Sequence, residues 1–236
     1  NTFKEIRIAA DTATAKAHQA AATASAKAGD VGHTLRGERN RPLLLREISA
    51  KDEPRIDLND QEFNRVLGGG LVPGSIVLLG GEPGIGKSTL TLQTILRLPT
   101  LQILYVSGEE SAHQLKMRAN RLPHDELDNV HILCETDLAI IFTHIKEVKP
   151  DIVVIDSIQT ISTDDVETSP GSITQVRECA SALLRFAKTS GIPVILIGHI
   201  TKEGTLAGPK ILEHIVDTVI QFEGDQHHMY RILRSI

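Results

Sequence analysis

Short apolar runs alternate along this chain with stretches in which apolar residues recur every three or four positions. The runs are typical of buried strands and cover residues 75–79, 103–106, 152–155 and 194–197. The helical spacing covers residues 87–98, 111–122, 137–148 and 172–189, after a short helix that Asp57 or Asn59 caps and that ends at Leu67. Residues 218–222 and 229–233 are typical of a hairpin around Gly224 and Asp225. The pattern predicts an α/β fold: a mostly parallel central sheet with helices on both faces and a C-terminal antiparallel hairpin.

This alternation begins only near Arg55, which divides the chain into two parts. Of residues 9–28, eleven are Ala and almost none is a large apolar residue, which predicts a linker that exchanges between coil and helix. A cluster of arginines follows and indicates either a solvated connector or a phosphate-binding strip: Arg36, Arg39, Arg41 and Arg46. We therefore expect residues 1–54 to be a flexible linker and residues 55–236 to be the folded core.

Composition and charge narrow the class of protein. The hydrophobic share of 41% is that of a globular protein, and no apolar run approaches the length of a membrane span. Two cysteines, Cys134 and Cys179, cannot supply a four-ligand zinc site or a disulfide framework, which favours a reducing, cytoplasmic setting. Residues 57–236 hold fifteen Lys or Arg against twenty-three Asp or Glu. Such an acidic core, without Trp, is not expected to bind nucleic acid with its whole surface, so a polyanion would meet local loops or a ring channel.

One segment carries a phosphate-binding signature. Between an expected strand and an expected helix the sequence fits G-x-x-x-x-G-K-[ST], at Gly81, Glu82, Pro83, Gly84, Ile85, Gly86, Lys87 and Ser88. The glycines let the backbone turn its N–H groups toward phosphate oxygens, and the helix adds the positive end of its dipole. We expect Lys87 to bind the β- and γ-phosphates of ATP, Ser88 to bind Mg²⁺ and Thr89 to contact the α-phosphate.

Carboxylates follow two of the expected strands. Asp156 ends the run 152–155, at the edge where α/β sheets bind ligands, and is expected either to bind Mg²⁺ or to cap a helix. Glu109 and Glu110 follow the strand 103–106 and so reach the same edge. They are either carboxylates that orient a water for ATP hydrolysis, which together with Lys87 would form the catalytic set, or ordinary residues of a helix's first turn.

A histidine and two loops also lie at this edge. His199 follows the strand 194–197 and is either a structural histidine or a residue that senses the γ-phosphate and moves the loop behind it. Loops beyond strand ends often carry function. The candidates are an acidic loop at 162–172 and a loop at 201–209 with Lys202 inside it and Lys210 just after it.

Taken together, these motifs resemble the RadA (Sms) family of bacterial DNA-repair proteins, which have RecA-like P-loop ATPase cores. The entry to the phosphate loop, residues 63–75, is similar to that of RecA-type cores in general. Motifs similar to those of the family lie in order at residues 80–90, 105–111, 156–160, 170–172, 175–178 and 198–204. The resemblance covers residues 55–236, and several independent motifs in order make it specific.

The resemblance implies a hexameric ATPase that binds single-stranded DNA and drives branch migration of recombination intermediates, with the RecA recombinase and replicative or repair proteins as partners. It implies that Lys87, Ser88 and Asp156 bind ATP and Mg²⁺. It also implies that Glu109 orients the water, with Glu110 beside it, and that His199 is a nucleotide-responsive switch. The two loops would face DNA through Ser172, Gln175, Arg177, Lys202 and Lys210.

The ends of the sequence depart from the family pattern. Family members begin with a four-cysteine zinc module and continue into a Lon-protease-like domain, and neither is in this sequence. We therefore expect a fragment that binds ATP but hydrolyses it weakly and assembles rings poorly. One alternative is a nucleotide-gated regulatory or scaffold ATPase, as in KaiC-like proteins, without a DNA substrate. A small-molecule P-loop kinase would need a lid with several arginines, and residues 200–210 contain none.

Overall fold

The computed structural model describes residues 44–47, 54–124, 128–199, 209–224 and 230–236. The chain divides into two units, Asn1–Lys51 and Asp52–Ile236. In the first unit the described residues form one short 3-10 helix, η1 (Leu45–Glu47). The sheet, the other helices and the candidate site belong to the second unit.

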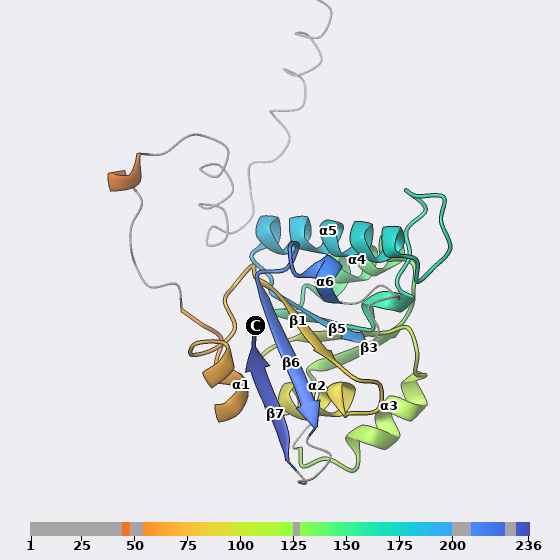
Figure 1. The fold of residues 1–236 in the computed structure, drawn as a ribbon. Helices are drawn as coiled ribbons and strands as arrows, with labels where there is room; N and C mark the ends of the chain where they lie inside the picture. Colours follow the sequence, from red (N-terminus) through yellow and green to blue (C-terminus); the bar gives the residue numbers. More distant parts are fainter. Residues whose placement is uncertain (1–43, 48–53, 125–127, 200–208, 225–229) are drawn as a thin grey trace, which may run out of the picture. The chain divides into compact units, whose positions relative to one another are not determined.

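A seven-stranded sheet forms the centre of the second unit, in the order β3-β2-β4-β5-β1-β6-β7 (Figure 1). Its strands are β1 (Ile76–Gly81), β2 (Ile103–Ser107), β3 (Val130–Cys134), β4 (Ile152–Asp156), β5 (Val194–His199), β6 (Thr218–Gly224) and β7 (Arg231–Ser235). Neighbouring strands are parallel except for β6 and β7, which form an antiparallel pair. The predicted α/β class, the mostly parallel sheet and the C-terminal hairpin are confirmed.

Helices cover both faces of this sheet (Figure 1). One face packs against α4 (Leu138–Val148), α5 (Ile173–Ser190), α6 (Pro209–Leu212) and the 3-10 helix η2 (Ile158–Thr160). The other packs against α1 (Gln61–Val66), α2 (Lys87–Ile95) and α3 (Ala112–Ala119). The strands contribute side chains to both hydrophobic cores, because successive side chains of a strand point to opposite faces of the sheet. In β1, for example, Ile76 and Leu78 join the first core, and Val77 and Leu79 join the second.

The strand β3, the short helix α6 and the 3-10 helices were not predicted, and α1 has a different cap from the one predicted. The strand β3 was not predicted, because it lies at the edge of the sheet and its side chains are only half-buried or exposed, so that it has no buried apolar run. The helix α1 is capped by Asp60, which accepts a hydrogen bond from the Phe63 N–H at 3.0 Å. The prediction of Asp57 or Asn59 as the cap was wrong, because Asp57 instead accepts from the Asn59 N–H at 2.8 Å. Among the helices of the described residues, none has the length and apolar character needed to cross a membrane.

Candidate nucleotide-binding site

The glycine-rich loop joins β1 to α2 at the carboxyl edge of the sheet. Gly84 and Gly86 have φ angles of 77° and 108°, in the left-handed region that favours glycine. Gly81 is needed for a different reason, because a Cβ at this position would lie 2.5 Å from the carbonyl oxygen of Phe222. The glycines of the signature therefore fit both the backbone angles of the loop and its close approach to β6.

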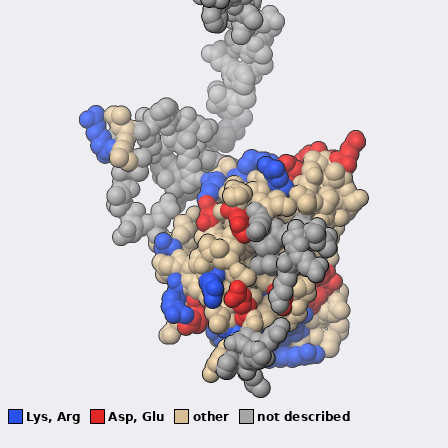
Figure 2. Space-filling view, in the orientation of Figure 1, with Lys and Arg blue, Asp and Glu red and all other residues tan. Residues whose placement is uncertain are grey.

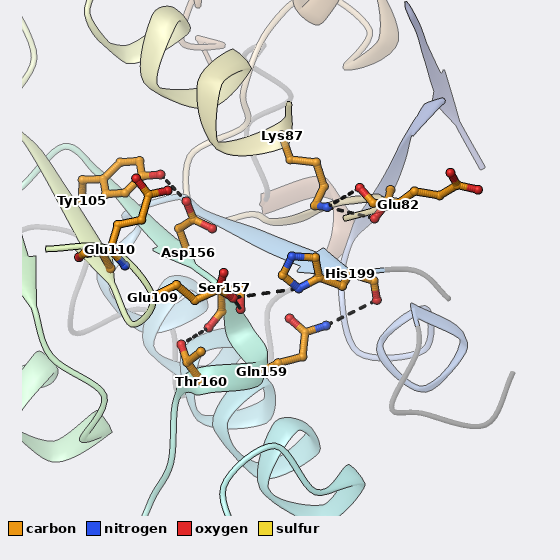
Figure 3. Close-up of polar contacts among 12 residues, drawn as sticks. Glu82, Lys87, Tyr105, Glu109, Glu110, Asp156, Ser157, Gln159, Thr160 and His199 are labelled. Carbon is orange, nitrogen blue, oxygen red and sulfur yellow. Dashed lines mark hydrogen bonds and ion pairs between the residues drawn. The ribbon is translucent and has the colours of Figure 1, made fainter. Parts of the chain in front are cut away.

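Lys87 is the first residue of α2 and is only 4% exposed. Its Nζ donates hydrogen bonds to the carbonyl oxygens of Gly81 at 2.9 Å and Glu82 at 3.0 Å, so the ammonium group lies over the loop (Figure 3). Burial lowers the pKa of Lys87, and the negative charges of Asp156 and Glu109 oppose that shift. One cation and two carboxylates thus act on one another at this edge of the sheet.

Asp156 ends β4 and is only 6% exposed. It accepts a hydrogen bond from the hydroxyl of Tyr105, which comes from the neighbouring strand β2 (Figure 3). Burial, followed by the charge of Asp156, raises the pKa of Tyr105 well above its usual value, so the hydroxyl remains a donor. The N-cap of the following helix η2 is Ser157, so Asp156 does not take the alternative role of a helix cap.

The adjacent carboxylates Glu109 and Glu110 have different partners. Oε1 of Glu109 accepts a hydrogen bond from Oγ of Ser157 at 2.5 Å and lies 3.9 Å from Nδ1 of His199. Glu110 instead forms a salt bridge of 2.7 Å with Arg118 of α3. The geometry therefore groups Glu109 with the other residues of the edge and ties Glu110 to a helix.

Neither carboxylate belongs to the first turn of a helix. The helix α3 begins at Ala112, and Ser111 caps it by accepting a hydrogen bond from the Gln114 N–H. The Gln114 side chain in turn accepts from the Ser111 N–H, which completes a capping box. The interpretation of the two carboxylates as ordinary first-turn residues does not fit this arrangement.

His199 is the last residue of β5 and pairs in register with Gly81 of β1. Its ring faces Glu109, and its carbonyl oxygen accepts a hydrogen bond of 3.5 Å from Nε2 of Gln159 (Figure 3). Oε1 of Gln159 is buried and has no hydrogen-bond partner among the described residues. The end of β5 is thus connected both to the carboxylate of Glu109 and to η2.

The structure gives Gln175 a different role from the predicted DNA contact. Gln175 is buried, at 2% exposure, and its side-chain amide forms hydrogen bonds with the acidic loop. The amide oxygen accepts from the Thr163 N–H, and the amide nitrogen donates to the carbonyl oxygens of Thr163, Val166 and Thr168. A side chain with these hydrogen bonds holds the loop in its conformation and is not exposed to bind a ligand.

The other residues predicted to face DNA are distributed differently. Ser172 caps α5 by accepting a hydrogen bond from the Gln175 N–H, whereas Arg177 is exposed on the same helix. Lys202 and the side chain of Lys210 lie outside the described residues. On the face shown in Figure 2, basic and acidic side chains of the described residues are interspersed rather than separated into broad bands.

A pocket of about 210 Å³ beside the phosphate loop was not predicted from the sequence. Its walls come from the loop and from the end of β6: Gly81, Glu82, Ile85, Gln221, Phe222, Glu223 and Gly224. The guanidinium of Arg231 lies nearby, 3.3 Å from where a Cβ of Gly86 would be. No local motif marks the four residues that β6 contributes, because β6 meets the loop through its pairing with β1.

Comparisons with known proteins agree with the geometry of the site. The model of the AAA domain family matches residues 40–205. Proteins named DNA repair protein RadA from Halalkalibacterium halodurans and Bacillus subtilis are each 52% identical over 198 residues, which is 83% of this chain and 43% of theirs. The protein of that name from Listeria monocytogenes is 52% identical over 202 residues, or 85% of this chain and 44% of its own. The chain therefore spans less than half the length of the curated relatives it matches.

Proposed function

Because this chain belongs to the AAA domain family and is a RadA-type ATPase core, we propose that it binds and hydrolyses ATP in DNA repair. The observation that carries this proposal is that Lys87, Asp156 and Glu109 lie together beside the glycine-rich loop (Figure 3). Transfer of a phosphoryl group to water requires a cation on the phosphates, a metal ligand and a group that orients the water. Lys87, Asp156 and Glu109, in that order, have the chemistry that these three roles require.

Lys87 and the N–H groups of the loop would bind the phosphates, with Lys87 exchanging its carbonyl partners for phosphate oxygens. The Ser88 hydroxyl and the Asp156 carboxylate fit Mg²⁺, which prefers oxygen ligands and needs few from the protein when it also binds phosphate. Within the described residues no group of three His, Cys, Asp or Glu side chains could hold a metal by itself. Mg²⁺ held there would supply positive charge beside the phosphate oxygens. Glu109 would orient the attacking water, and Lys87 would stabilise the charge that develops.

The pocket between the loop and β6 fits the rest of the nucleotide. It adjoins Gly81 and Glu82, so a ligand with its phosphates in the loop would extend into it. Ile85 and Phe222 give its wall an apolar surface suited to a base, and the neighbouring Arg231 adds a positive charge beside Gly86. This pocket supports a nucleotide, rather than an inorganic phosphate, as the ligand.

The proposal extends to DNA as the substrate, through the names of the relatives and the position of His199. We propose a hexamer in the cytoplasm that binds single-stranded DNA and drives branch migration, with recombination and replication proteins as partners. His199 would relay the state of the nucleotide from Glu109 to the loop 201–209. The acidic core suits a ring, because each subunit then needs to bring only a few cations to a shared channel.

ATP hydrolysis measured with and without single-stranded DNA tests this function, on the full-length protein and on its Lys87→Ala and Glu109→Gln variants. Stimulation by DNA that both substitutions abolish is the expected result. Hydrolysis that depends on Lys87 but ignores DNA would favour the nucleotide-gated regulatory ATPase and would remove the DNA assignments. Hydrolysis that survives Lys87→Ala would contradict the assignment of the site itself.

A further inference from the structure

Tyr105 is the largest of the side chains that are completely buried in the described residues. It lies in β2, whose other core residues are aliphatic, and it belongs to the core covered by α2 and α3. A buried hydroxyl costs free energy unless it is hydrogen-bonded, and Phe would fill almost the same space without that cost. The position of the hydroxyl therefore calls for an explanation beyond packing.

The partner of this hydroxyl is the carboxylate at the end of the next strand. Tyr105 pairs in register with Val154, so Asp156 lies two residues further along β4 on the same face. An aromatic side chain can reach such a diagonal neighbour, and the hydroxyl donates its hydrogen bond to Oδ2 of Asp156. The ring is enclosed by the core, so the direction of the donor is fixed.

The backbone adds a second connection between the same two strand ends. The Gly108 N–H, just after β2, donates to the carbonyl oxygen of Asp156 at 2.9 Å. A Cβ at Gly108 would lie 1.9 Å from Oγ1 of Thr160, so only glycine fits this close approach. Both the main chain and the side chain of Asp156 are thus held from β2.

We propose that Tyr105 is a positioning residue for the metal site, holding the Asp156 carboxylate in the orientation that receives nucleotide-bound Mg²⁺. This inference rests on the proposed function, because it takes Asp156 as a metal ligand. Carboxylate ligands are commonly oriented by outer hydrogen-bond donors, and loss of such a donor typically weakens metal binding by about 10- to 100-fold. Tyr105 acts only through Asp156, so its removal should affect metal-dependent binding and spare metal-independent binding.

The Tyr105→Phe variant tests this inference, because it removes the hydroxyl and leaves the ring. We would measure ADP affinity by calorimetry in EDTA and over a series of Mg²⁺ concentrations. The expected result is an unchanged affinity in EDTA and a rise of about tenfold in the Mg²⁺ concentration that gives half of the metal-dependent gain. The control is Thr94→Val, which removes another buried hydroxyl, one that donates to the Leu90 carbonyl oxygen within α2. This control should leave the Mg²⁺ dependence unchanged.

The possible outcomes distinguish a failure of this inference from a failure of the proposed function on which it rests. If Tyr105→Phe has the same Mg²⁺ dependence as the wild type, the role of Tyr105 is overturned while the ATP site stands. If the wild type binds ADP equally well in Mg²⁺ and in EDTA, the metal assignment of the proposed function fails and takes the inference with it. In an Asp156→Asn background, Tyr105→Phe should change the affinity in Mg²⁺ no further, and an additive loss would mean that Tyr105 acts by another route.

Discussion

The hydroxyl of Ser157 donates a hydrogen bond of 2.5 Å to Oε1 of Glu109, across the boundary between β4 and β2. Nδ1 of His199, at the end of β5, lies 3.9 Å from the same oxygen. Three neighbouring strands thus contribute to the surroundings of one carboxylate. Glu110, the next residue along, is paired with Arg118 of α3 instead.

These two carboxylates provide a matched pair of variants. We expect Glu109→Gln to lower the rate of ATP hydrolysis by about 10²- to 10⁴-fold, because an amide cannot accept a proton from the attacking water. Its affinity for ATP should stay close to that of the wild type. Glu110→Gln should change the rate by less than about threefold, since the Glu110 side chain forms a partly exposed salt bridge with Arg118, and such pairs contribute little. Single-turnover hydrolysis and nucleotide binding measure both effects, and equal losses in the two variants would refute the choice of Glu109.

The position of His199 predicts that its loss affects the coupling between nucleotide and DNA binding but not nucleotide binding itself. In His199→Ala we expect nucleotide affinity to be nearly intact and the affinity for single-stranded DNA no longer to depend on the nucleotide. Fluorescence anisotropy with labelled DNA, in ADP and in a non-hydrolysable ATP analogue, measures this dependence. His144→Ala is the control, because that histidine is on α4 and its Nδ1 pairs with Glu147 at 3.0 Å. A wild-type response in His199→Ala would remove the relay.

Lys87 should give the stability of the fold an alkaline pH dependence. Burial lowers the pKa of Lys87, so the folded protein releases this proton at a lower pH than the unfolded chain does. Between the lowered pKa and the ordinary lysine value the unfolded chain binds more protons, and stability rises with pH. The wild type should therefore gain free energy of unfolding relative to Lys87→Met between about pH 7 and pH 10.

Urea denaturation without nucleotide, at both ends of that pH range, measures this gain. Lys146→Met is the control, because Lys146 is an exposed lysine on α4. It should show the same difference from the wild type at both pH values. A constant difference for Lys87→Met as well would contradict the lowered pKa.

The buried amide of Gln175 predicts a structural effect on the acidic loop. Gln175→Leu leaves the Thr163 N–H and three carbonyl oxygens of the loop without their partner. We expect a loss of about 2–3 kcal/mol in the free energy of unfolding and faster hydrogen exchange in residues 163–168. The exposed neighbour Thr174→Ala should cost less than about 0.5 kcal/mol. Unchanged exchange in the loop of Gln175→Leu would show that the loop does not depend on this amide.

The parts of the site that could be predicted from the sequence are those encoded locally. The phosphate loop and Asp156 each follow an apolar run that is recognisable by itself. The bond between Tyr105 and Asp156 joins residues 51 positions apart, and it depends on a register between strands that no local pattern reveals. The burial of Gln175 could not be predicted for a related reason. A polar residue on a helix is normally exposed, and only the folded loop supplies the hydrogen-bond partners that compensate for its burial.

The order of the strands has a consequence for how this protein folds during its synthesis on the ribosome. Among the described strands, β1, which leads into the phosphate loop, pairs with β5 and β6 alone. The Ile76 N–H also donates to Asp217, which lies 141 positions further along the chain. In a chain that is still being translated, β1 therefore remains an apolar strand with unpaired backbone groups until β5 and β6 have been synthesised. ATP binding is a property that the nascent chain acquires late, and a chain released before β6 would expose a strand prone to aggregation.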